Sequence, residues 1–217
     1  MLNLSLGSHA ALLGYLGRQL DNFFPDGRGE AERPALQARL EPALQRLERC
    51  IDQVRMWTPG RFDHLHSSQY TIFLYYLAHT IWKGGGERAV CNKLFGLNKA
   101  LNGIDLFYEI ELPEVFFIGH SVGIVLAKAT YGNRLVLYQN STVGKNHGEA
   151  PVLGDGVVMY PNTAIIGRCE IGAGTVVSQG TSIVNRSTPG SCMVFPGDAG
   201  GLVIKPPTRD VLADLFR

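Results

Sequence analysis

Residues 153–188 read LGDGVVMYPNTAIIGRCEIGAGTVVSQGTSIVNRST, and the spacing of their apolar side chains decides the fold. An aliphatic residue or methionine recurs at every sixth position, namely Leu153, Met159, Ile165, Ile171, Val177 and Ile183. Four residues after each comes a small or β-branched side chain: Val157, Thr163, Cys169, Thr175, Thr181 and Ser187. The spacing continues upstream, with one extra residue and one loop, through Leu106, Leu112, Ile118, Ile124, Tyr131, Leu137 and Val143.

A six-residue period predicts a parallel β-helix, in which each hexapeptide forms one short strand and one corner and three hexapeptides close a triangular coil. The aliphatic side chains fill the interior, and the small ones lie near corners where a larger side chain would clash. Glycines such as Gly154, Gly167 and Gly172 relieve the backbone there. The alternative is a meander of short antiparallel strands, but that fold would show a two-residue period and Asn-Gly hairpin turns.

The first hundred residues have helical periodicity instead. Only six of the 26 glycines lie in residues 1–83, whereas fifteen lie between residues 104 and 201. Apolar side chains at i, i+3 and i+4 spacing predict helices over residues 8–22, about 36–54, 67–83 and 87–101. We therefore predict an α+β chain with an α-helical domain at 1–103, a parallel β-helix at 104–190 with a loop at 144–151, and a C-terminal extension at 191–217.

Composition excludes several classes of function. The 20 Lys and Arg residues balance the 19 Asp and Glu residues, so the net charge of +1 offers no basic surface for nucleic acid. No apolar stretch is long enough to cross a bilayer, and the first residues lack the cationic start of a signal peptide. We expect a cytoplasmic protein with neither nucleic-acid nor membrane partners. The four scattered cysteines form no CxxC pair, so neither a zinc site nor a disulfide framework is indicated.

One motif narrows the family. The sequence GID at 103–105 is followed by GHSVGIV at 119–125, and the helical segment YYLAHTIW precedes both at 75–82. With these residues and the hexapeptides, the chain resembles the serine acetyltransferase family of the hexapeptide-repeat acyltransferase superfamily over roughly residues 63–207. The resemblance implies a left-handed β-helix and an acetyl-CoA-dependent O-acetyltransferase that acts on serine or a related small hydroxylated acceptor.

Asp105 and His120 match the catalytic pair of that family. A hydroxyl attacks a thioester only poorly until a base removes its proton, and histidine, with its ordinary pKa near neutrality, suits that task. Fifteen residues are nearly one coil of eighteen, so Asp105 should lie near His120 on the adjacent coil and fix its tautomer. The alternative is that His120 is an ordinary polar residue that follows the interior position Ile118.

Other positions bear on the acceptor. The family has a second active-site histidine before a proline in a longer loop; here Ala150 precedes Pro151, and His147 is a possible substitute. Asp63 and His64 lie near the place of an acidic substrate-binding residue in the family. An Asp63 that favours a helix N-terminus is an equal alternative.

Gly119 is the clearest departure from the family. There, an aspartate directly precedes the catalytic histidine and helps to hold the acceptor's ammonium group, but Gly119 precedes His120 here. Glycine cannot replace a charged partner without loss. We therefore expect the catalytic pair in a changed acceptor pocket at Gly119, and an amino sugar or nucleotide sugar of surface polysaccharide synthesis is the alternative acceptor.

The resemblance also implies a donor site and an assembly. By matched position, Gly144, Pro161 and Lys205 are candidates to bind acetyl-CoA in a groove between subunits of a homotrimer or of a dimer of trimers. Lys205 is equally well interpreted as a solvated lysine. γ-Type carbonic anhydrases use the same β-helix with three zinc-binding histidines, but only His120 and His147 lie in this repeat, so no metal is expected. A non-catalytic assembly partner is a third hypothesis, against which Asp105 and His120 argue.

Overall fold

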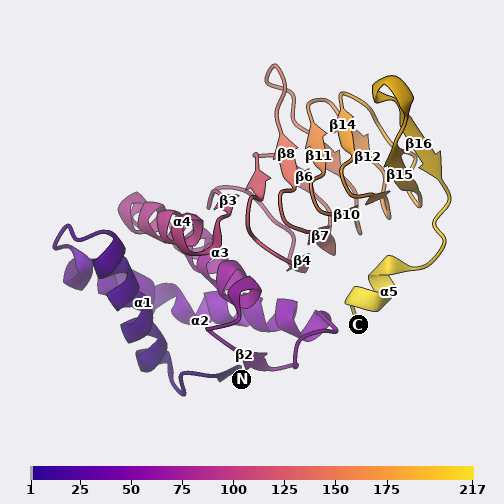
Figure 1. The fold of residues 1–217 in the computed structure, drawn as a ribbon. Helices are drawn as coiled ribbons and strands as arrows, with labels where there is room; N and C mark the ends of the chain where they lie inside the picture. The colour runs from indigo at the N-terminus through magenta and orange to yellow at the C-terminus, as the bar shows by residue number, and fades with distance from the viewer. Residues whose placement is uncertain (1) are drawn as a thin grey trace. The chain divides into compact units, whose positions relative to one another are not determined.

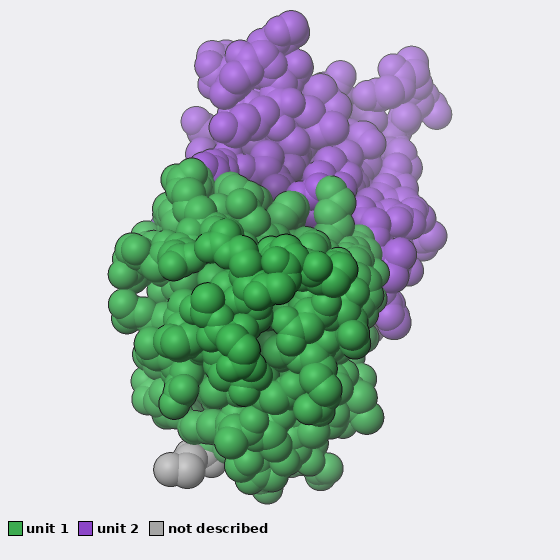
Figure 2. Space-filling view, turned by 90° about the vertical axis from the view of Figure 1, so that its left-hand side faces the viewer, with its two compact units in different colours: residues 1–103, 107–109 green, residues 104–106, 110–217 purple. Residues whose placement is uncertain are grey.

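A computed structural model describes residues 2–217 of the protein. The chain forms two compact units, which Figure 2 colours separately. The first contains the chain up to residue 103 together with residues 107–109, and the second contains residues 104–106 and 110–217.

Four helices build the first unit: α1 (His9–Phe23), α2 (Gly29–Gln53), α3 (Ser67–Lys83) and α4 (Arg88–Asn102). Two short strands, β1 (Asn3–Leu4) and β2 (Arg61–Phe62), pair in parallel beside them. The α1 helix begins after Ser8, whose side-chain oxygen accepts a hydrogen bond from the Ala11 amide at 3.1 Å. All four predicted helices are present, and α2 extends back to Gly29, well before its apolar periodicity starts.

The α3 helix is the core of this unit. It packs against both α2 and α4, and almost all its side chains are buried. Ion pairs of Lys93 also link α4 to the start of α2 and to the turn before it. Lys93 Nζ lies 2.8 Å from the Asp26 carboxylate and 2.7 Å from that of Glu32, a residue only 3% exposed. Because burying an unpaired charge is costly, Lys93 is what allows Glu32 to lie inside.

The second unit is a triangular β-helix whose strands stack in successive coils (Figure 1). One wall contains β4 (Phe116–Ile118), β7 (Leu135–Leu137), β10 (Val158–Met159), β13 (Val176–Val177), β15 (Met193–Pro196) and β16 (Leu202–Lys205). The second wall contains β3 (Asp105–Leu106), β5 (Val125–Leu126), β8 (Thr142–Gly144), β11 (Ala164–Ile166) and β14 (Ser182–Val184). The third contains β6 (Thr130–Tyr131), β9 (Val152–Leu153) and β12 (Glu170–Ile171). Every pairing is parallel except that of β15 with β16. A short 3-10 helix, η1 (Asp198–Gly200), and a last helix, α5 (Val211–Leu215), complete the chain.

The strand register confirms the hexapeptide reading. Met159 pairs with Val177 and Ile165 with Ile183, each 18 residues apart, so three hexapeptides make one coil. The thirteen residues of the six-residue series are all buried, at 8% exposure or less. Across the predicted loop the interval grows to 22 residues, as between Leu137 and Met159, because the loop adds residues at a corner without breaking the stack.

Two details differ from the predicted pattern. Leu126, not Ile124, pairs with Leu106, because residues 121–124 form a turn and delay the strand by two residues. At the other end, Ser187 is exposed and Thr188 takes the buried corner position, where its hydroxyl lies 2.9 Å from that of Thr175. The strand β15 then pairs in parallel with β13, so the wall continues beyond residue 190, where the sequence places the end of the β-helix.

The small corner residues have a clear physical role. The Thr163 hydroxyl donates to the Tyr160 carbonyl at 2.8 Å, and the Thr175 hydroxyl donates to the Gly172 carbonyl at 2.7 Å. Each hydroxyl therefore hydrogen-bonds a carbonyl of the tight corner, and at Gly172 it does so beside the Thr175 amide, which donates to the same carbonyl at 3.3 Å. Asn140 and Asn162 take positive φ angles at corners of successive coils, and their side-chain amides hydrogen-bond at 2.9 Å. Along residues 2–217, no helix is both long and apolar enough to pass through a bilayer.

The interior predicts a stability difference. Ile165 is fully buried between two strands of its wall, so Ile165→Ala should lower the free energy of unfolding by about 2–5 kcal/mol through lost burial and a cavity. Ile204→Ala, at a residue 44% exposed, is the matched control and should cost less than about 1 kcal/mol. Chemical denaturation of both variants measures the difference, and equal costs would contradict this account of the core.

Candidate active site

His120 stands on a turn that is fixed at several points. It follows β4, and the Gly119 amide donates to the Leu137 carbonyl of the next coil at 2.9 Å. The turn closes with the Ile124 amide donating to Ser121 at 3.2 Å, and Gly123 supplies a φ of 77°. A Cβ at that glycine would collide with the Asn140 side chain. His120 is therefore an exposed side chain on a rigid backbone.

Asp105 lies on the coil before this turn. It begins β3, and its amide donates to the Ile124 carbonyl at 2.8 Å, while its Cα pairs with Val125. The carbonyl that holds Asp105 thus belongs to the turn that carries His120. A backbone hydrogen bond therefore joins Asp105 to the chain four residues after His120, on the adjacent coil. Asp105 is half-buried and His120 is exposed.

Gly119 is closely covered by a residue that the sequence analysis did not select. A Cβ on Gly119 would lie 2.5 Å from two carbon atoms of the Tyr138 ring. Tyr138 in turn stacks on Tyr160, with ring centroids 5.4 Å apart and an angle of 18° between the planes. The hexapeptide spacing indicates this pair, because both tyrosines directly follow interior positions of the repeat, Leu137 and Met159. Their side chains therefore point outward on neighbouring coils.

His147 lies at the tip of a two-residue hairpin within the predicted loop. Asn146 and Glu149 exchange both backbone hydrogen bonds at 3.0 Å, and His147 and Gly148 have φ angles of 49° and 86°. Positive φ at both central positions is the requirement of a tight type I′ turn. The loop is therefore an ordered hairpin that presents an exposed histidine.

The predicted donor-site residues lie on three different strands or corners. Gly144 ends β8, and its carbonyl accepts from Gly167 at 3.0 Å. Pro161 follows β10, and its carbonyl accepts from Gly180 at 3.1 Å. Lys205 ends β16, is exposed, and has its ammonium 5.6 Å from the centroid of the Phe195 ring. Both carbonyls are thus held by the next coil, and the lysine side chain is exposed.

Asp63 and His64 belong to the helical unit and have structural partners there. The Asp63 carboxylate accepts from the Leu65 amide at 3.0 Å, and His64 Nδ1 lies 2.7 Å from the Ser5 hydroxyl. Asp63 also lines a pocket of about 180 Å³ with Arg61 and His66. The turn before α3 therefore uses one Asp63 oxygen for backbone support.

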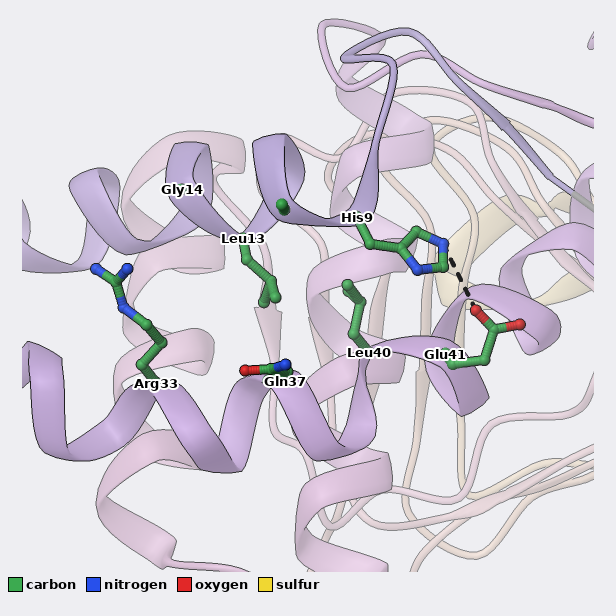
Figure 3. Close-up of a pocket in the computed structure, with 8 residues that line it drawn as sticks. His9, Leu13, Gly14, Arg33, Gln37, Leu40 and Glu41 are labelled. Atoms are coloured by element: carbon green, nitrogen blue, oxygen red, sulfur yellow. Dashed lines mark ion pairs between the residues drawn. The ribbon is translucent and has the colours of Figure 1, made fainter.

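A larger pocket, of about 510 Å³, lies between α1 and α2 (Figure 3). Leu13 and Leu40 face it, and at one end His9 Nε2 lies 3.5 Å from the Glu41 carboxylate. None of the predicted site residues lines this pocket. Over residues 2–217, no three His, Cys, Asp or Glu side chains are gathered as a metal site requires.

Comparison with known sequences gives consistent relatives. No protein-family model matches the chain. It is similar to serine acetyltransferase 4 of Arabidopsis thaliana, with 29% identity over 136 residues that cover 60% of this chain and 38% of that protein. A serine acetyltransferase of Synechococcus elongatus is 31% identical over 108 residues, covering 46% of this chain and 44% of that protein. The chain thus spans less than half the length of these curated relatives.

Solved structures share the architecture over most of the chain. The serine acetyltransferase of Brucella abortus aligns with a TM-score of 0.72 and 18% identity, covering 92% of this chain and 84% of that one. The Neisseria gonorrhoeae protein, solved in complex with serine, aligns with a TM-score of 0.68 and 20% identity, covering 93% and 84%. These likenesses confirm the predicted fold, helices followed by a parallel β-helix. The chain is therefore similar to serine acetyltransferases in sequence over part of its length, and it shares the helices and the parallel β-helix of their solved structures.

Proposed function

We propose that the protein is an acetyl-CoA-dependent serine O-acetyltransferase. The observation that carries this proposal is the corner where Asp105 and the turn of His120 meet, because it presents an exposed base on a fixed backbone with a carboxylate on the coil behind it. The names of the sequence relatives support serine over the amino sugar or nucleotide sugar considered above. One solved relative carries serine and another, from Entamoeba histolytica, carries cysteine.

The reaction assigns a step to each residue of the pair. His120 takes the proton of the serine hydroxyl while that oxygen attacks the thioester carbon of acetyl-CoA. The tetrahedral intermediate then collapses, the carbon–sulfur bond breaks, and the departing thiolate receives the proton from the imidazolium. Asp105 holds the ring in the productive tautomer and stabilises its positive charge in between. The products are O-acetylserine and free CoA, and no cofactor other than the co-substrate is needed.

For the donor, the proposal places acetyl-CoA against Gly144 and Pro161 and pairs a CoA phosphate with Lys205. Both corner residues have their carbonyls engaged with the following coil, so they offer a fixed surface that costs little to order on binding. Lys205 is exposed and offers a mobile positive charge suited to a phosphate.

For the assembly, the proposal is a homotrimer or a dimer of trimers with active sites between subunits, in the cytoplasm. Two apolar side chains near His120 in the sequence are exposed: Val122, within the turn of residues 121–124, is 64% exposed, and Val125, just after it, is 44% exposed. A partner subunit that covered them would close one side of the site and exclude water there.

The catalytic pair predicts a graded loss of activity. With L-serine as acceptor, thiol release from acetyl-CoA should fall in kcat by about 10²–10⁴-fold in His120→Ala, because no base remains to take the hydroxyl proton. Asp105→Asn should lie between this variant and the wild type. His9→Ala removes an exposed histidine of α1 and should match the wild type. Wild-type kinetics in His120→Ala would contradict the assignment of His120 as the general base.

His147 is proposed as a residue on the acceptor side. His147→Asn should keep the melting temperature, because asparagine tolerates the positive φ of the hairpin tip. Loss of a hydrogen bond to a charged acceptor group should raise the KM for L-serine about tenfold and leave the KM for acetyl-CoA unchanged. An unchanged KM for serine assigns His147 to the hairpin alone.

The proposed assembly predicts a molecular mass in solution and the effect of one substitution. Light scattering after gel filtration should give three or six times the chain mass of 23.7 kDa. Val125→Glu places a charge on the exposed apolar side chain beside His120 and should lower both the mass and the specific activity. A fully active wild type at the mass of one chain contradicts a shared site.

A further inference from the structure

Tyr138 and Tyr160 form an aromatic wall on the β-helix. They occupy equivalent places on neighbouring coils, since the Tyr138 amide donates to the Met159 carbonyl at 3.0 Å and the Tyr160 amide donates to the Val177 carbonyl at 3.1 Å. The rings stack, and Phe117 meets Tyr138 edge-on with centroids 6.2 Å apart. Both tyrosines are half-buried, so part of each ring still faces solvent.

The wall continues to the residue next to the proposed base. On the coil before Tyr138, the equivalent place is Gly119, whose amide donates to the Leu137 carbonyl. Because a Cβ there would lie 2.5 Å from the Tyr138 ring, the ring occupies the space in which a side chain at position 119 would start. This overlap is too close for any real side chain, and Gly119 is therefore needed by Tyr138. The ring lies against the backbone one residue before His120.

We infer that Tyr138, backed by Tyr160, is an acceptor-selecting residue that presents an uncharged aromatic face to the acceptor's ammonium group beside His120. This inference rests on the proposed serine acetyltransferase function. An aromatic face attracts a cation through its ring quadrupole, and the attraction is stronger where water is excluded. No carboxylate at position 119 is needed for such recognition.

The wall is suited to this task in two ways. Burial, together with the neighbouring Tyr160, raises the pKa of Tyr138, so the phenol stays neutral at physiological pH. The stack with Tyr160 and the edge contact with Phe117 hold the ring in one orientation, so little side-chain entropy is lost when an acceptor binds.

Kinetics of three variants test the ring face. Tyr138→Leu keeps apolar bulk but removes the π-system, and it should raise the KM for L-serine about three- to tenfold while the KM for acetyl-CoA stays within about twofold. Tyr138→Phe keeps the ring face and should behave like the wild type. Phe23→Ala removes an exposed aromatic side chain of α1 and is the control. A KM for serine unchanged in Tyr138→Leu overturns the inference.

A stability cycle tests the geometry without reference to activity. Gly119→Ala should lower the melting temperature in the presence of Tyr138, because its Cβ meets the ring. In a protein that also carries Tyr138→Ala, the same glycine change should cost much less, since the space is then open. Equal costs in the two backgrounds would place the ring elsewhere and overturn the inference.

Acceptor assays with the wild-type protein distinguish a failure of this inference from a failure of the proposed function. Turnover of L-serine with an unaltered Tyr138→Leu variant overturns only the role of the ring. Turnover of an amino sugar or nucleotide sugar, but not of serine, overturns the proposed function. In that case Tyr138→Leu should raise the KM of the amino sugar but not that of the same sugar without its amino group. An equal effect on both sugars overturns the role of Tyr138 as well. A wild type that acetylates none of these acceptors overturns both.

Discussion

The hydrogen-bond ladder between successive coils is the constraint on which the rest of the second unit depends. Each strand is only two to four residues long, so it cannot satisfy its backbone groups except through the coils above and below. The ladder sets a coil length of 18 residues, as in the pairing of Leu153 with Ile171. Additional residues are tolerated only at corners, which is why the hairpin at Asn146–Glu149 leaves the walls intact.

The candidate site lies at one of the departures from this regularity. From Leu106 to Leu126 the interval is 20 residues, and from Leu126 to Val143 it is 17. The added length forms the turn of residues 121–124, which carries His120 away from the wall and into solvent. In the interior of the β-helix a reactive side chain would be buried, and on a wall it would lie flat. At a corner of this kind it can project into solvent. The helical unit has no comparable repeat; its core is the buried α3 helix, and Lys93 compensates the buried charge of Glu32.

The six-residue period of the sequence predicts which residues lie inside the β-helix, but it does not predict which of them pair where a turn shifts the strand register. Interior positions such as Ile165 and Val177 could be identified because one apolar residue in six is a strong signal. The change from Ile124 to Leu126 could not, because both are aliphatic and buried and only the backbone turn decides between them. Asp105 and His120 were proposed through a resemblance to a family motif, and the structure places Asp105 on the coil next to the turn that follows His120.

Gly119 and Tyr138 show why a departure from a family motif cannot be judged one residue at a time. Taken alone, Gly119 reads as the loss of a charged group beside the base. In the structure the same glycine is required by the ring that covers it, so the two positions form one unit. An aspartate at position 119 would collide with the Tyr138 ring, because its Cβ would lie 2.5 Å from two ring carbons. A side chain at position 119 therefore requires the ring to move or to be replaced, so we expect the two positions to change together.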